Sequence, residues 1–450
     1  MKRLDPMENK LVEFDAENSR LSEEKLKGLE DRLQPEVQNM REATEKGYDD
    51  PRASINLPDD EETLKQVKSL VEDKRQLEPE YLVVAGIGGS NLGTVAVQEA
   101  VLGKLYNQKN PDTKILYAET TDSEHIGDIL DIIESSLERG GNVLLNGVSK
   151  SGGTTETISN FEVIAEKISE YKDEPEKYIT VTSQKDSLFH KLAEEKNYST
   201  LEIPEKVGGR YSVLSPVGLY PLGILGVDLE ELLEGAERVR ERCLNKDIDD
   251  NPAARSAASI YLNQEQGRDI HDLFLYGKDL EMIGKWYRQL TGESLGKKHN
   301  RDGEKVNAGV TPIASVGSTD LHSMYQLYMG GPDDKLHTFV YTEENDREVR
   351  VPENPEYSNL VEDVQGRPLN RIMDAIFEGV NNSFKERKRP FNVVKIRDIS
   401  EESIGALLQF KMMEMMYLGY LMNVNPFNQP SVERYKDETI EILKKGGRDE

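Results

Sequence analysis

The sequence is poor in cysteine and has no long hydrophobic run. Its one cysteine, Cys243, lies in a charged segment, which excludes an intrachain disulfide and a multi-cysteine metal site. No apolar stretch approaches the roughly 18 residues that cross a bilayer. The polar residues that follow Met1 lack the apolar core of a signal peptide. We therefore expect a cytoplasmic protein with no membrane partner.

Basic residues are also scarce relative to acidic ones. The chain has 84 Asp and Glu against 57 Lys and Arg, a formal net charge of −27. Such a charge argues against binding to nucleic acid or to an anionic membrane surface. A phosphorylated ligand would need a local exception, so loops that gather Arg, Lys and backbone N–H groups become candidate sites.

Metal, redox and nucleophile motifs are missing as well. None of the six histidines forms a His-x-x-x-His or His-Glu-x-x-His pair, which makes a histidine metal site unexpected. No redox-cofactor signature and no serine or cysteine nucleophile motif occurs. Acid–base chemistry without a cofactor or metal is the expectation that remains.

Strand and helix patterns alternate along most of the 450 residues, which predicts an α/β fold with mainly parallel sheets. Length and pattern predict a helical N-terminal segment (1–65), a first α/β domain (66–228), a second α/β domain (229–423), and a C-terminal loop and helix (424–450). Predicted strands include 81–85, 115–118, 143–148, 178–182, 199–203, 272–276, 308–313, 336–341 and 391–396.

The most informative segment joins the predicted strand 143–148 to a loop rich in hydroxyls. Ser149, Ser151 and Thr154 offer donors, and the glycines at 152–153 let backbone N–H groups approach a ligand. The loop lacks the residue order of a nucleotide P-loop or of a dinucleotide fold, so a phosphate on a small metabolite fits it best. A strand-to-helix turn capped by hydroxyl side chains is the simpler alternative.

A similar unit lies upstream, where the predicted strand 81–85 enters a glycine-rich turn, 86–93, containing Gly89 and Ser90. Glycine turns of this kind are common, so this unit alone is weak. Both turns follow strands of one expected parallel sheet, and ligands of such folds bind at the carboxyl ends of the strands. The pair therefore favours a ligand site more than either turn alone.

Polar candidates for catalysis lie further along the chain. Arg210 follows two glycines and could reach an anionic group. Gln289 and Glu293 flank the expected end of a helix (280–290) with Gly292 as its break, and a loop carboxylate can act as a general base. Each also has an ordinary surface interpretation. His322 lies in a turn that enters a helix, and a proline-bounded loop near the C-terminus presents Gln429 and Lys436.

Taken in order, these segments resemble the phosphoglucose isomerase family over most of the chain. The matching pieces are Gly86-Ile87-Gly88-Gly89-Ser90, Ser149-Lys150-Ser151-Gly152, Gly208-Gly209-Arg210-Tyr211-Ser212, Gly292-Glu293-Ser294, His322, and Asn425-Pro426-Phe427 through Lys436. The resemblance implies two sugar-isomerase-type doubly wound α/β domains and a homodimer. It also implies interconversion of glucose 6-phosphate and fructose 6-phosphate, in glycolysis and gluconeogenesis, without metal or cofactor.

The resemblance also implies a role for each matching residue. Glu293 would move the proton between C1 and C2, and Arg210 would stabilise the cis-enediolate. His322, from the neighbouring subunit, and Lys436 would assist ring opening. The remaining residues would bind the substrate: Gly89, Ser90, Ser149, Lys150, Ser151 and Thr154 around the phosphate, and Gln289 and Gln429 at the hydroxyls.

Three positions depart from the family pattern. Asn428 stands where the family usually has aspartate, Ser431 where it has glycine, and Gly153 where a hydroxyl residue is common. Two alternatives to this assignment stay open. A non-catalytic sugar-phosphate sensor would keep the phosphate loops without the acid–base residues, and a broader isomerase would also accept mannose 6-phosphate.

Overall fold

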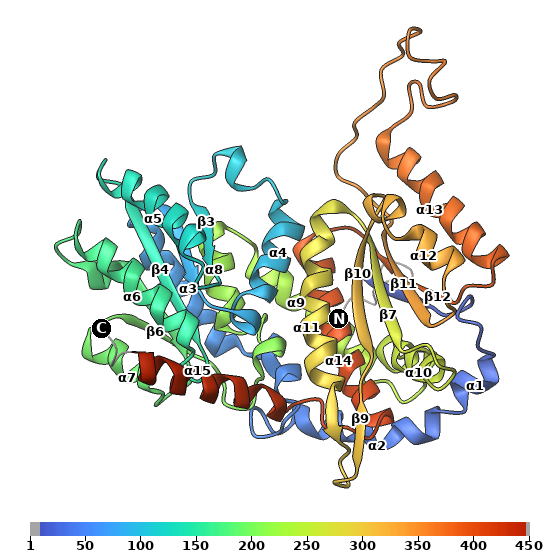
Figure 1. Cartoon of the computed structure of the whole chain (residues 1–450), viewed down its shortest axis with the longest axis horizontal. Helices are drawn as coiled ribbons and strands as arrows, with labels where there is room; N and C mark the ends of the chain where they lie inside the picture. Colours follow the sequence, from blue (N-terminus) through green and yellow to red (C-terminus); the bar gives the residue numbers. More distant parts are fainter. Residues whose placement is uncertain (1–9, 447–450) are drawn as a thin grey trace, which may run out of the picture.

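A computed structural model describes residues 10–446 and shows two sheets flanked by helices (Figure 1). The first sheet is entirely parallel, in the order β3-β2-β4-β5-β6. Its strands are β2 (Pro79–Ala85), β3 (Lys114–Ala118), β4 (Asn142–Ser149), β5 (Ile179–Ser183) and β6 (Ser199–Glu202).

The second sheet has the order β1-β12-β11-β7-β10. Its strands are β1 (Val12–Asp15), β7 (Ile270–Tyr276), β10 (Thr311–Gly317), β11 (Lys335–Thr342) and β12 (Phe391–Ile396). All of its pairs are parallel except β1 with β12. The α/β class with mainly parallel sheets is therefore confirmed, although the second predicted strand of this half, 308–313, lies a few residues earlier than β10.

Both sheets follow one winding rule. Numbered by appearance in each half, the first sheet runs 2-1-3-4-5 and the second runs 2-1-3-4, with β1 in the fifth place. In sheets of this kind the connections reverse direction beside the first strand, which opens a crevice at the carboxyl ends of the strands. In the first sheet the direction reverses at β2, which lies between β3 and β4. The two candidate phosphate-binding loops follow β2 and β4.

Helices cover both sheets and join them. In the first half they are α3 (Glu61–Arg75), α4 (Leu92–Leu102), α5 (Ser123–Leu137), α6 (Thr155–Ser169), α7 (Leu188–Glu195) and α8 (Pro216–Leu225); in the second half they are α9 (Leu229–Cys243), α10 (Pro252–Gln264), α11 (Glu281–Leu295), α12 (Tyr325–Gly330), α13 (Leu369–Glu386) and α14 (Glu401–Leu421). Figure 1 shows α4 and α11 side by side between the sheets, and they are in contact. These helices follow the first strand of each half, β2 and β7, so the junction joins equivalent elements.

The N-terminal segment is not wholly helical as predicted. Helices α1 (Glu23–Lys27) and α2 (Glu30–Thr44) lie within the predicted helical segment, but β1 adds an antiparallel edge strand to the second sheet. Residues 1–9 of this predicted segment lie outside the described residues. Val12 is fully buried, so pairing and burial against β12 outweigh the helical tendency of the surrounding charged sequence.

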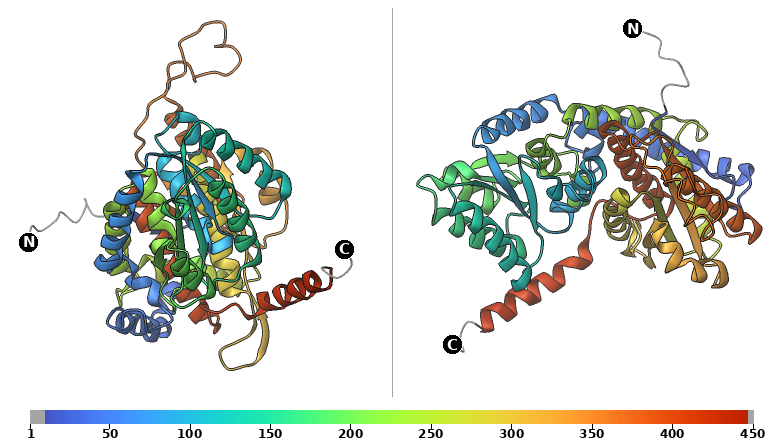
Figure 2. Two further views of the ribbon diagram at one scale, coloured as in Figure 1. Left: turned by 90° about the vertical axis from the view of Figure 1, so that its left-hand side faces the viewer. Right: turned by 90° about the horizontal axis from the view of Figure 1, so that it is seen from above.

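The last described element is α15 (Glu433–Gly446), which extends away from both lobes in the two views of Figure 2. A small antiparallel hairpin, β8 (Lys297–His299) with β9 (Lys305–Ala308), follows α11. Within residues 10–446, no helix combines the length and apolarity needed to cross a membrane.

Helix α14 forms the centre of the second half, with nearly every side chain buried. It crosses α9 at two glycines: a Cβ on Gly405 would lie 1.9 Å from the Leu232 carbonyl oxygen, and one on Gly235 would lie 1.8 Å from the Glu402 carbonyl oxygen. The two backbones can approach this closely only because both residues lack a side chain.

We predict that Gly405→Ala lowers the free energy of unfolding by about 1–3 kcal/mol or more, because the added methyl group forces α9 and α14 apart. Chemical denaturation measures this change. The control is Gly379→Ala on α13, where no heavy atom lies within 4 Å of the new Cβ. That variant should be neutral or gain up to about 1 kcal/mol in helix propensity. Equal losses in both variants would contradict the prediction.

Candidate active site

The hydroxyl-rich loop closes into a compact turn between β4 and α6. The Ser149 and Thr154 hydroxyl oxygens are 3.1 Å apart, and the Gly152 N–H donates to Ser149 Oγ over 3.2 Å. Gly152 has a φ of 71°, which favours glycine. Thr154 is the N-cap of α6, but its side chain makes no capping hydrogen bond. The first N–H groups of α6 are therefore open to an anion.

Lys150 supplies the cation of this loop. Its side chain forms no salt bridge with any residue of the described range 10–446. Burial lowers its pKa, Glu205 raises it, and the positive charge of Arg210 lowers it further. A half-buried lysine in the same loop as hydroxyls and uncapped N–H groups is suited to an anionic ligand. An anion bound there would raise the pKa of Lys150 again.

The glycine-rich turn after β2 touches the segment that carries Arg210. A Cβ on Gly89 would lie 2.3 Å from the Gly209 carbonyl carbon, so only glycine allows this contact. Ser212 Oγ also donates to the Gly89 carbonyl. The contact brings the β2 loop and the 208–212 segment together at the carboxyl end of the first sheet.

Arg210 is almost completely buried, with 1% of its side chain exposed. Its Nε donates to Ser294 Oγ at 2.8 Å, and one terminal nitrogen donates to Gln429 Oε1 at 2.7 Å. The other terminal nitrogen donates to the carbonyls of Pro426 and Asn428. A buried guanidinium needs such partners, and here they come from α11 and from the C-terminal loop.

Glu293 faces this guanidinium, with its Oε2 3.5 Å from Arg210 Nη1. The expected helix break at Gly292 is wrong, because α11 continues to Leu295. The cost of a helical glycine, about 1 kcal/mol, is smaller than the gain from burying Leu290, Ser294 and Leu295 in the last turns. Glu293 is therefore a helical residue one turn after Gln289, not a loop residue.

This helical spacing joins the two side chains. Gln289 Nε2 donates to Glu293 Oε1 over 3.2 Å, which leaves the Gln289 amide oxygen buried without a partner. A buried carbonyl-type oxygen without a donor is costly. The unsatisfied oxygen is thus available to accept a hydrogen bond from a ligand hydroxyl.

Two predicted site residues lie outside this contact group. His322 lies on an exposed turn, 319–322, after β10, and its side chain makes no hydrogen bond within residues 10–446. Lys436 lies on α15, where its ammonium pairs with Glu433 at 3.0 Å. The remaining predicted residues form two neighbouring sets: Ser149, Lys150 and Thr154 in one, and Gly89, Arg210, Gln289, Glu293 and Gln429 in the other. Ser90 and Ser151 lie in the two loops, with partly exposed and exposed side chains.

Comparison with known proteins gives this arrangement a family. A family model described as phosphoglucose isomerase matches residues 73–449. The chain belongs to the phosphoglucose isomerase family. It is 33% identical to a glucose-6-phosphate isomerase of Carboxydothermus hydrogenoformans, covering 96% of this chain and 93% of the relative. It is 34% identical to a second one, of Rubrobacter xylanophilus, covering 97% and 99%.

Solved structures agree on the fold. A hypothetical protein from Thermus thermophilus superposes with a TM-score of 0.84 at 29% identity, over 96% of this chain and 99% of the other. A glucose-6-phosphate isomerase from Chlamydia trachomatis superposes with a TM-score of 0.82 over 97% and 89%. At 19% identity, the second likeness shows a shared fold alone.

Sequence reasoning missed one residue that contacts this candidate site. Lys297 is 6% exposed, and its ammonium donates to the carbonyls of Glu293 and Asn428. Its only sequence signal was a spacing of four residues from Glu293, and a lysine in a charged stretch looks like a surface residue. The departure at Asn428 leaves these contacts intact, because they use a backbone oxygen that any residue provides.

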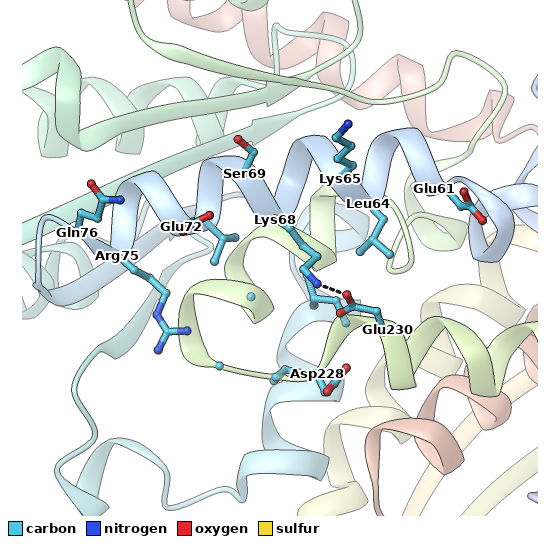
Figure 3. A pocket seen from close by; sticks show the side chains of 15 residues that line it. Glu61, Leu64, Lys65, Lys68, Ser69, Glu72, Arg75, Gln76, Asp228 and Glu230 are labelled. Carbon is cyan, nitrogen blue, oxygen red and sulfur yellow. Dashed lines mark hydrogen bonds and ion pairs between the residues drawn. The ribbon is translucent and has the colours of Figure 1, made fainter.

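A separate hollow on the described surface lies away from these residues. A groove of about 1020 Å³ runs between α3 and the start of α9 and contains none of the candidate residues (Figure 3). Its walls carry both charges, and an ion pair between Lys68 and Glu230 spans it. Mixed, self-paired charges of this kind offer little to an anionic ligand.

We predict that Arg210→Lys lowers kcat/KM at least about 10²-fold, because a lysine cannot satisfy the side chains and carbonyls that now share the guanidinium. Steady-state kinetics measures the loss. The control is Arg301→Lys, whose exposed guanidinium bonds the nearby Asn423 side chain and Tyr420 carbonyl. Its kcat/KM should stay within about twofold. Similar losses in both variants would mean that position 210 has no special role.

Proposed function

We propose that this chain is a cytoplasmic glucose-6-phosphate isomerase of glycolysis and gluconeogenesis. It would interconvert glucose 6-phosphate and fructose 6-phosphate. The observation that carries this proposal is the approach of a buried guanidinium, Arg210, to within 3.5 Å of the Glu293 carboxylate. A base and an oxyanion stabiliser thereby lie together beside a loop suited to a phosphate.

The phosphate would occupy the loop after β4. Three features support this placement: Lys150 has no salt bridge within residues 10–446, the Ser149 and Thr154 hydroxyls lie 3.1 Å apart, and the start of α6 is uncapped. Gly153 adds no hydroxyl to this set, so the backbone N–H groups would contribute a larger share of the binding. The N-terminal end of the helix dipole favours the same charge.

Proton transfer would follow from the second set. The C–H group beside a sugar carbonyl is a weak acid, so a base alone removes its proton slowly. Glu293 would take the proton from C2 and return it to C1. Arg210 would stabilise the negative charge that develops on the cis-enediolate oxygens. The unpartnered oxygen of Gln289 and the amide of Gln429 would orient the sugar hydroxyls.

Ring opening would involve His322 and Lys436, with His322 contributed by a second copy of the chain in a homodimer. Two observations support a dimer: His322 is exposed and makes no side-chain hydrogen bond within the described residues, and apolar side chains are exposed on the long extension between β11 and α13. Figure 1 shows this extension projecting from the second lobe. Its large exposed side chains are Val349 (59%), Tyr357 (56%), Leu360 (75%) and Val361 (58%).

We predict that Glu293→Gln lowers kcat by about 10²- to 10⁴-fold while a sugar phosphate still binds, because the amide keeps the size of the side chain but cannot take a proton. A coupled assay with fructose 6-phosphate measures turnover, calorimetry measures binding, and mannose 6-phosphate tests the broader specificity. Glu162→Gln, on the exposed face of α6, is the control.

Near-normal turnover of Glu293→Gln would exclude Glu293 as the base. If the unaltered protein binds sugar phosphates but turns none over, the chain is a sensor rather than an enzyme.

The dimer proposal predicts complementation between inactive chains. Glu293→Gln and His322→Ala chains, mixed under conditions of subunit exchange, form about half heterodimers. Each heterodimer has one site with both residues intact, so activity should recover to about a quarter of the unaltered level.

The control mixture pairs Glu293→Gln with Arg210→Lys. Because Arg210 and Glu293 contact each other within one chain, every heterodimer site then carries a lesion and nothing should recover. Demonstrated exchange without recovery in the first mixture would reject the shared site.

A further inference from the structure

Lys297 is a buried cation for which the proposed chemistry names no role. It is the first residue of β8, four residues after Glu293 and just past the end of α11. Its exposed fraction is 6%, whereas the neighbouring Lys298 is exposed. Burying an ammonium group is costly unless it is well hydrogen-bonded, so its contacts should explain its position.

The ammonium of Lys297 joins two backbone segments of the site. It donates to the Glu293 carbonyl, one of the last carbonyls of α11, and to the Asn428 carbonyl at 2.7 Å. Carbonyls at a helix C-terminus lack partners within the helix and carry partial negative charge, so a cation there stabilises the last turn. That turn carries the Glu293 side chain.

The Asn428 carbonyl is shared between two cations. Arg210 also donates to it, over 3.2 Å, and binds the side chain of the next residue, Gln429. Lys297 and Arg210 therefore both bind the C-terminal loop. Lys297 links the loop to the end of α11, and Arg210 links it to the 208–212 segment.

The charges of Arg210 and Glu293 shift the pKa of Lys297 in opposite directions. Its pKa falls to about 8, chiefly because of burial and further because of the positive charge of Arg210, while the carboxylate of Glu293 acts in the opposite direction. No salt bridge joins Lys297 to an acidic side chain within residues 10–446. Its hydrogen bonds to two carbonyls are charge-assisted only while the amine is protonated.

We propose that Lys297 is a positioning residue. Its ammonium group fixes the backbone of Glu293 and the Asn428–Gln429 loop, so that the base and the hydroxyl-binding amide keep their places beside Arg210. The proposal rests on the isomerase function proposed above. Lys297 touches no reacting atom, so its effect reaches the reaction through the groups that it holds.

Three variants test this role by kinetics. Lys297→Met keeps length but cannot donate, and a small displacement of Glu293 should lower kcat by about 10- to 100-fold with KM within about threefold. Lys297→Arg keeps a cationic donor and should recover at least about a third of kcat. Lys298→Met, the exposed neighbour, should match the unaltered enzyme.

The pH dependence of kcat/KM separates positioning from mere support of the fold. Raising the pH through about 8 removes the proton from Lys297, so kcat/KM of the unaltered enzyme should decline above that pH. At pH 9 only about a tenth of the side chains stay protonated. Arginine keeps its charge in this range, so Lys297→Arg should lack this part of the decline. Any change in the protonation of Lys150, the half-buried lysine of the loop after β4, is common to both enzymes and cancels in the comparison.

A double-mutant cycle tests the route through the loop. If Lys297 acts by holding the segment with Gln429, the losses in kcat from Lys297→Met and Gln429→Ala should be clearly less than multiplicative when combined. Fully multiplicative losses would overturn this route. Should Lys297→Met fail to fold, the comparison with Lys297→Arg decides, and identical pH profiles of the arginine variant and the unaltered enzyme overturn the proposal.

The outcomes also separate this inference from the function itself. If Glu293→Gln is inactive but Lys297→Met keeps kcat within about twofold of the unaltered enzyme, the isomerase assignment holds and the positioning role is wrong. If the unaltered enzyme has no isomerase activity, the proposed function fails first.

Discussion

The site depends on one buried charge, the guanidinium of Arg210. Removing a cation from water is costly, and the cost is met only when nearly every N–H finds a partner. Those partners are Ser294 and Glu293 on α11, and Pro426, Asn428 and Gln429 in the C-terminal loop. The hydrogen bonds of the Arg210 side chain therefore bring together segments that are distant in sequence. Its contacts with Pro426 and Gln429 span 216 and 219 residues of the chain.

The sheets explain why these segments can meet at all. The first sheet changes winding direction at β2, so the loops that follow β2 and β4 open at one edge. The contact of α4 with α11 then sets the second half against that edge. The junction of the two halves thus supplies the proposed base, while the first half supplies the proposed anion loop and the arginine.

Much of this could be predicted from local patterns. Apolar runs located most strands of both sheets to within a few residues, and hydroxyls with glycines located the loop after β4. The helix end at Gly292 was wrong because burial of Leu295 and its neighbours outweighs a local glycine preference. Strand β1 was missed because its partner, β12, lies at the other end of the chain.

Lys297 was missed for a related reason. Its burial depends on the approach of the C-terminal loop, which no local pattern contains. The close contact of Gly89 with Gly209 likewise cannot be predicted from the sequence of either segment alone. Local patterns do not predict contacts between segments that are distant in sequence, and the contacts of the candidate site are mainly of this kind.

The pairing of β1 with β12 also has a consequence for how the protein is made. Val12 leaves the ribosome long before its partner Ile396, which follows only after both sheets have largely been translated. Until then β1 has no edge to join, and closing so long a loop carries an entropic cost that nearer contacts avoid. The β12 edge is likewise open until β1 returns, and an open edge is a template for pairing with other chains. Among the described residues, the earliest strand in the sequence is thus the one that finally closes the second sheet.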